Sequence, residues 1–157
     1  MKRACLFMIA VLIVFSACQK QSEDNKQAET KAMSNKIEII DPWIRPAAEG
    51  TNTALFLKVF NGTEEDDTLF SATSDFAEVA QVHETYKKDD DMMGMREVEY
   101  IVIPTGDTIV FKPRDLHIML INLGKDVLAG NKEEVILRFK NFGSVLVNAE
   151  VRDMPKM

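Results

Sequence analysis

The sequence predicts an all-β domain, an antiparallel β-sandwich. Its apolar residues fall in short runs rich in Val, Ile, Thr and Phe, the composition typical of strands. Gly, Asn, Pro and Asp stand between these runs and supply turns. No stretch of comparable strength has helical periodicity, and there is no internal repeat. Eight or nine strands at this spacing indicate a sandwich.

Each predicted strand is bounded by a turn or by a polar stretch. In order, the strands are Lys36 to Ile40, Ala54 to Phe60, Thr68 to Ala72, Val79 to Thr85, Val98 to Ile103, Thr108 to Lys112, Leu116 to Ile121, Glu134 to Lys140 and Val145 to Val151. The turns include Asn61-Gly62, Pro104 to Asp107, Asn122 to Gly124, Gly130-Asn131 and Asn141 to Gly143. Asp75 to Ala77 are expected to form one turn at most. Tyr86 to Met95 are expected to form a loop eased by Gly94, with Lys87 to Asp91 solvated.

The N-terminus is typical of an exported lipoprotein. Lys2 and Arg3 precede an apolar run that is too short to span a bilayer, so residues 1–17 are predicted to be a signal peptide. The following Phe15-Ser16-Ala17-Cys18 resembles the lipobox of bacterial lipoproteins, in which the cysteine is acylated. The alternative is a soluble secreted protein cut after Ala17, although ordinary signal peptidase would prefer a smaller residue than Phe15.

The chain divides into four predicted parts: the signal peptide, a lipidated Cys18 with a tether through residue 35, a domain over 36–152 and a tail over 153–157. The tether is polar and lacks aromatic residues, so it cannot bury enough apolar surface to fold. The domain is large enough for a single core. These features predict attachment to the membrane through the N-terminal lipid, in the bacterial envelope on the periplasmic or another extracytoplasmic face.

Cysteine count and charge exclude several classes of protein. If Cys5 leaves with the leader and Cys18 carries lipid, the folded part has no thiol for a disulfide, a redox pair, a nucleophile or a blue-copper site. The chain carries 19 basic and 25 acidic residues, and loss of Lys2 and Arg3 makes its net charge still more negative. Nucleic acid is therefore not an expected partner, because phosphate binding requires a basic face.

The candidate functional residues are histidines and methionines. The only two histidines, His83 and His117, and four of the nine methionines fall between positions 83 and 119. Because side chains alternate on a strand, His117 and Met119 share one face, while Leu116, Ile118 and Leu120 share the core face. His83 is also expected to point away from the core. The loop after it could return Met92, Met93 or Met95 to the same place.

This mixture of ligands is soft. Copper(I) favours thioether and neutral imidazole, whereas zinc prefers thiolate or imidazole and calcium requires oxygen. Thioethers carry no proton that competes with the metal. The alternative is that each methionine only fills space in the core, which is the commoner role of this residue. From the residues alone, both interpretations remain open.

The order His83, Met95, His117, Met119 resembles the signature of the periplasmic copper chaperone family called PCuAC. That signature has His, ten residues, Met, twenty-one residues and His-x-Met. Here twenty-one residues separate Met95 from His117, but eleven separate His83 from Met95, so Met93 competes with Met95. Further agreement covers about Ile40 to Val151 and includes Trp43-Ile44-Arg45, ALFLKVFN from Ala54, MREV from Met95, IPTGDTIVFKP from Ile103, LHIML from Leu116 and FKNFGSVLV from Phe139.

The resemblance implies a cupredoxin-like Greek-key β-sandwich that carries copper(I) and is not an enzyme. The implied ligands are His83, Met95, His117 and Met119, with Met93 and Met92 as candidate accessory ligands. The implied acceptor is an apo copper protein such as the copper A subunit of cytochrome c oxidase, or another thiol chaperone. Two alternatives remain: copper storage or detoxification, and a lipoprotein sandwich without a metal.

Overall fold

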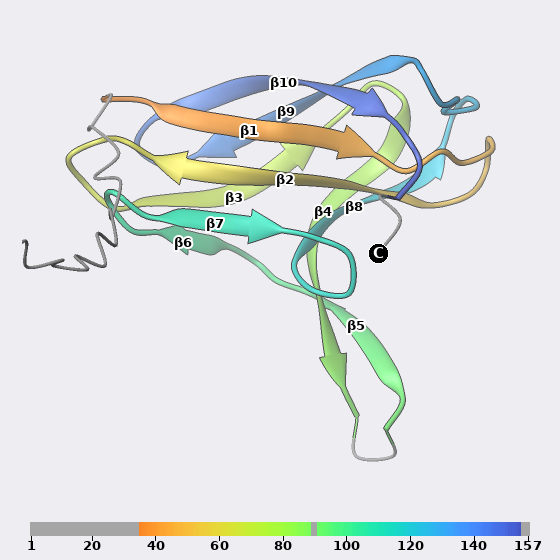
Figure 1. Ribbon diagram of the computed structural model, residues 1–157, viewed down its shortest axis with the longest axis horizontal. Coiled ribbons are helices and arrows are strands. Elements are labelled where there is room, and N and C mark those ends of the chain that lie inside the picture. Colours follow the sequence, from red (N-terminus) through yellow and green to blue (C-terminus); the bar gives the residue numbers. More distant parts are fainter. Residues whose placement is uncertain (1–34, 89–90, 155–157) are drawn as a thin grey trace, which may run out of the picture. The chain divides into compact units, whose positions relative to one another are not determined.

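The computed structural model describes residues 35–88 and 91–154. Within these ranges every regular element is a strand. The strands are β1 (Ile37–Ile44), β2 (Thr53–Asn61), β3 (Asp67–Thr73), β4 (Ala77–Lys87), β5 (Met93–Glu97), β6 (Ile101–Ile103), β7 (Thr108–Phe111), β8 (His117–Leu123), β9 (Lys132–Phe139) and β10 (Gly143–Val151) (Figure 1). The all-β prediction is confirmed. Cys18, the signal peptide and the tether through residue 34 lie outside the described residues.

The strands form one continuous path in the order β5-β4-β8-β2-β1-β10-β9-β3-β6, and β7 pairs with β2. A further pairing between β3 and β4, at Ala72 opposite Ala80, closes most of this path into a flattened barrel. Many neighbours in space are distant in sequence, as Greek-key connections require. One pairing, between β1 and β10, is parallel, although the sequence predicts an antiparallel sandwich.

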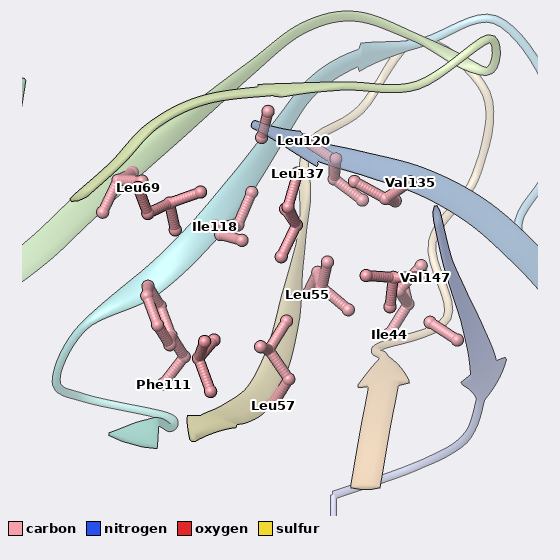
Figure 2. Close-up of a cluster of buried hydrophobic side chains, with 14 of the residues drawn as sticks. Ile44, Leu55, Leu57, Leu69, Phe111, Ile118, Leu120, Val135, Leu137 and Val147 are labelled. Atoms are coloured by element: carbon pink, nitrogen blue, oxygen red, sulfur yellow. The ribbon is translucent and has the colours of Figure 1, made fainter. Parts of the chain in front are cut away.

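The core lies between the inward faces of the strands. Its centre is made of aliphatic and phenyl side chains from β1, β2, β8, β9 and β10, including Ile44, Leu55, Ile118, Leu120, Val135, Leu137 and Val147 (Figure 2). On β8, Ile118 and Leu120 are fully buried, and Leu116 packs against the same cluster. The predicted core face of this strand is therefore confirmed.

The largest departure from the predicted elements lies between residues 86 and 103. The expected loop from Tyr86 to Met95 is wrong, because β4 continues to Lys87 and Met93 to Glu97 form β5. The sequence Met-Gly-Met-Arg-Glu contains no β-branched residue and one glycine, so strand propensity gave no signal for it. The strand predicted from Val98 begins only at Ile101.

β1 is longer than predicted because it includes an irregularity. It continues past Ile40 to Ile44, and its register with β2 shifts between Ile40 and Trp43. Asp41 there has a φ of 49° and Pro42 follows, so the chain bends without ending the strand. Trp43 is thereby placed on the outer face, beside the residues described next.

Candidate metal centre

The register of β4 against β8 brings three of the predicted site residues together. His83 lies directly opposite His117, and Gln81 lies directly opposite Met119. Residues opposite each other in an antiparallel pair share a face of the sheet. The two histidines and Met119 are therefore neighbours on the outer face, as their alternation predicted.

The two imidazoles are separated by a distance that suits one ion. Their ring centroids are 6.0 Å apart, with planes inclined by 54°. A metal–imidazole bond of about 2 Å on each side, with the ring radii added, spans roughly 6 Å between centroids. A single small cation could therefore contact both rings after modest rotation of the side chains.

His117 is closely packed. It is 6% exposed, and its ring lies 6.3 Å from that of Phe56, which in turn packs on Trp43 at 4.5 Å. Trp43, Ala54 and Phe56 form a small buried cluster on this outer face, separate from the main core. His117 Nδ1 lies 2.9 Å from the carbonyl oxygen of Asp115. A carbonyl only accepts, so Nδ1 carries the proton and Nε2 keeps a lone pair for a ligand.

His83 has the opposite arrangement of nitrogens. Its Nε2 lies 3.2 Å from Gln81 Oε1, which accepts a hydrogen bond, so Nε2 carries the proton. Its Nδ1 is buried and has no hydrogen-bond partner. A buried lone pair without a partner is costly, and a metal ion would satisfy it. This unpartnered nitrogen is the observation on the structure that best fits a metal ligand.

Burial and a neighbouring histidine favour the neutral form of His83. Burial lowers the pKa of His83 below its ordinary value, and the neighbouring His117 lowers it further, while Glu97 acts in the opposite direction. Glu97 lies directly opposite His83 on β5. A neutral imidazole can bind a metal, whereas a protonated one cannot.

The methionines of β5 share this face. The paired strands β4 and β5 form a two-stranded ribbon. Met95 lies opposite Thr85 and Met93 lies opposite Lys87, so both methionines project from the same side of this β4–β5 ribbon as His83. Met95 is the diagonal neighbour of His83, at roughly 7–8 Å between Cα atoms, whereas Met93 is one residue pair further out. Met92 precedes the strand. The register therefore favours Met95 over Met93 as a partner of His83.

The three methionines near the ribbon tip do not fill the core. Met92, Met93 and Met95 are 57%, 58% and 60% exposed, and only Met119 is partly buried. The packing interpretation of these residues is therefore wrong for all three. Among residues 35–88 and 91–154, no group of three or more His, Cys, Asp and Glu side chains could hold a metal.

The other face of the ribbon has a structural role. Tyr86 lies opposite Gly94, and a Cβ atom added at Gly94 would come within 2.7 Å of the Tyr86 ring. Arg96 lies 5.3 Å from the centre of that ring and forms an ion pair with Glu84. Gly94 does not have a positive φ, so its predicted role in a turn is wrong: it makes room for the tyrosine.

Sequence reasoning missed Gln81, the Asp115 carbonyl and Phe56 as parts of the site. The alternation of β4 does place Gln81 on the face of His83, which was the available signal. The contact of Phe56 with His117 depends on β2 lying beside β8, with Ala54 opposite Met119. Pairing of strands so distant in sequence cannot be read from local pattern.

The fold and the site together define a class of protein: an all-β domain that carries imidazoles and thioethers on one outer face. Solved structures share the fold. The copper-bound PCuAC domain from PmoF2 is similar with a TM-score of 0.63 and 25% identity, covering 76% of this chain and 94% of that domain. The apo PCuAC domain from PmoF1 has a TM-score of 0.65 and 22% identity, covering 76% and 95%. The latter shows the fold alone, and together they confirm the cupredoxin-like sandwich.

The chain belongs to the family described as "Putative lipoprotein LpqE-like", whose model matches residues 37–151. The "Putative lipoprotein Lxx21020" of Leifsonia xyli is 29% identical over 144 residues, covering 92% of this chain and 86% of that protein. The uncharacterized protein RP573 of Rickettsia prowazekii is 27% identical over 136 residues, covering 83% and 72%. Within residues 35–88 and 91–154, the structure has no helix long and apolar enough to cross a bilayer.

Proposed function

We propose that this domain binds one copper(I) ion through His83, Met95, His117 and Met119, and that it carries the ion to an acceptor protein. The observation that supports this most directly is the register of β4 and β8, which sets the two histidines opposite each other with Met119 beside them. The copper-bound state of the similar PmoF2 domain adds support for the metal.

The proposed ligands suit copper(I) because all are soft and uncharged. Neutral imidazole and thioether favour copper(I) over calcium or magnesium, which require oxygen. His117 offers Nε2 and His83 offers Nδ1, since their other nitrogens are held by Asp115 and Gln81. The histidines are largely covered, whereas Met95 is 60% exposed, so incoming ligands can reach the site from the side of Met95.

Release would proceed by ligand exchange. Thiolates of an acceptor replace the thioethers and imidazoles one at a time, and copper keeps its oxidation state throughout. Met95 is the most exposed of the four side chains and stands on the ribbon, so an acceptor would approach the ion from this side. No bond of a substrate is broken in this process, which makes the protein a carrier.

The ligand set is tested by exchanging both methionines for leucine. Met95→Leu with Met119→Leu conserves side-chain volume and removes both thioethers, so the fold should persist. Copper(I) titration against a competing chelator should show affinity lower by about tenfold or more, and circular dichroism should stay unchanged. Met154→Leu, an exposed methionine outside the strands, is the matched control. Unaltered affinity in the double variant would contradict this ligand set.

We further propose that the acceptor is a dithiol site such as the apo copper A domain of cytochrome c oxidase. Copper(I)-loaded protein should transfer its ion when mixed with that domain, and deletion should lower oxidase activity most under copper limitation. Retention of the ion despite a stronger acceptor, or copper sensitivity with normal oxidase activity, would instead indicate storage or detoxification.

We also propose that Cys18 carries lipid and attaches the domain to the outer side of a bacterial membrane. Supporting this are the lipobox-like Phe15-Ser16-Ala17-Cys18 and the lipoprotein description of the family. The wild type should partition into detergent, and Cys18→Ser should move it to the aqueous phase. Recovery of the wild type wholly in the aqueous phase would contradict the anchor.

A further inference from the structure

The β4–β5 ribbon has two methionines, Met93 and Met95, and the proposed site uses only Met95. Pairing between β4 and β8 ends at His83, whereas β4 pairs with β5 from His83 to Lys87, so beyond His83 these two strands form a two-stranded ribbon (Figure 1). A two-stranded ribbon has no core of its own for an apolar side chain to fill. Met93 is nevertheless 58% exposed there, one residue pair beyond the proposed ligand Met95.

We propose that Met93 and Met95 together form a second site for a soft monovalent cation, made of thioethers, which shares Met95 with the main site. This inference rests on the proposed function for the identity of the ion as copper(I). It adds a step to that function: the ion enters and leaves over the ribbon.

The spacing of the two methionines supports a shared ion. They are two residues apart on one strand and therefore project from the same face, with Cα atoms roughly 6.5–7 Å apart. His117 and Met119 have the same spacing in the main site. Methionine is unbranched and has three rotatable bonds, so both sulfur atoms can turn toward an ion between them.

The charges around the pair do not oppose a cation. Lys87, opposite Met93, forms an ion pair with Asp91, and Arg96 on the other face forms one with Glu84. Glu97 follows Met95 on the same face and contributes a negative charge. A monovalent cation at Met93 and Met95 is therefore favoured by the carboxylate of Glu97. The cationic side chains of Lys87 and Arg96 are already paired, and Lys88 lies beside Gly94 on the face away from the methionines.

Movement between the two sites keeps Met95 as a ligand throughout. As the coordinate bond from Met93 breaks, a bond from His83 forms and bonds from His117 and Met119 complete the main site. On release these three bonds break and the bond from Met93 forms again. No electron or proton is transferred, since copper stays copper(I) and His83 Nδ1 already carries a lone pair. Sharing Met95 avoids a free ion between the two sites.

The test uses silver(I), a soft monovalent ion that does not change oxidation state, and the full-length protein with 13C-methyl methionine. In His83→Gln/His117→Gln, which removes both imidazoles, silver should still shift the NMR signals of the Met93 and Met95 methyl groups and leave Met154 unshifted. Adding Met93→Leu to that variant should abolish the Met95 shift. Absence of any Met93 shift at excess silver would overturn the second site.

Release kinetics give an independent measure. In the otherwise wild-type protein, Met93→Leu should slow transfer of copper(I) to a dithiol chelator severalfold and change the equilibrium affinity little, whereas Met154→Leu should change neither. An unchanged transfer rate would overturn the role in entry and release. If silver shifts Met93 and Met95 but the wild type shows no histidine-dependent binding, the proposed function fails while the second site stands.

Discussion

The proposed ligands come from two regions of the fold that differ in packing, the strand β8 and the strand β5. His117 and Met119 belong to β8, whose intervening Ile118 is fully buried in the main core, and His117 itself is packed against Phe56. Met95 belongs to β5, which pairs only with β4 among the described strands and exposes more than half of the methionine. One half is built into the barrel wall and the other is attached to it.

This difference separates two requirements of a metal carrier. A ligand that must fix geometry benefits from a packed strand, because close packing holds its rotamer. A ligand that must be exchanged benefits from exposure and weak local packing, which lower the cost of movement. His83 joins the two halves, since β4 pairs with β8 on one side and with β5 on the other.

The largest expected contrast is in stability. His117→Ala removes a buried ring and its hydrogen bond to Asp115, so we expect the free energy of unfolding to fall by about 2–3 kcal/mol. Met95→Ala removes an exposed side chain and should change it by no more than about 0.5 kcal/mol. Urea unfolding of the metal-free variants measures both. Equal losses of unfolding free energy in the two variants would contradict the distinction between the packed strand β8 and the exposed β4–β5 ribbon.

A smaller effect is expected from the residue that orients His83. Gln81→Leu removes the oxygen that accepts a hydrogen bond from His83 Nε2, so the neutral ring no longer prefers the tautomer protonated at Nε2. Copper(I) affinity should therefore fall by about tenfold. The 15N chemical shifts of the His83 ring report the tautomer directly. Gln81→Glu keeps an acceptor and should preserve the wild-type tautomer. An identical ring spectrum in Gln81→Leu would show that Gln81 has no such role.

The pH dependence should also differ between the halves. Because the pKa of His83 is lowered in the folded state, the unfolded chain binds more protons between that pKa and the ordinary value near 6.5. Stability therefore rises with pH across this window and falls on acidification. Copper(I) affinity should likewise weaken at acid pH, while thioether binding at Met93 and Met95 should not. NMR titration of His83 and affinity measured across pH check both, and a flat affinity would contradict the histidine ligands.

The smallest effect is expected on the ribbon. Gly94→Ala places a Cβ against the Tyr86 ring, which can swing aside, so the cost should stay below about 1 kcal/mol. The displaced ring should lose its contact with Arg96, visible as altered aromatic NMR signals. Adding Tyr86→Ala should relieve the cost. Purely additive effects of the two substitutions would show that ring and glycine do not interact.

The sequence predicted the wall better than the ribbon, for a physical reason. A half-buried strand shows a clear alternation of apolar and polar residues in the sequence. This alternation correctly assigned His117 and Met119 to the face opposite Ile118 and Leu120. β5 is exposed on its methionine face and has little burial on the other, so no apolar alternation marks it. The formation of β5 depends on its pairing with β4, and the register of that pairing decides whether Met93 or Met95 lies nearer to His83. Only the folded chain defines this register.

The two terminal strands of the sheet affect the tendency of the protein to self-associate. β5 and β6, the terminal strands of the path, contain only five and three residues. An open strand edge can add a strand from another chain, and short edges that carry charge discourage this. β5 ends in Arg96 and Glu97 and includes Gly94, all poor partners for a neighbour's strand. The protein can thus present unpaired thioethers to solvent on a strand that offers neighbouring copies little opportunity to aggregate.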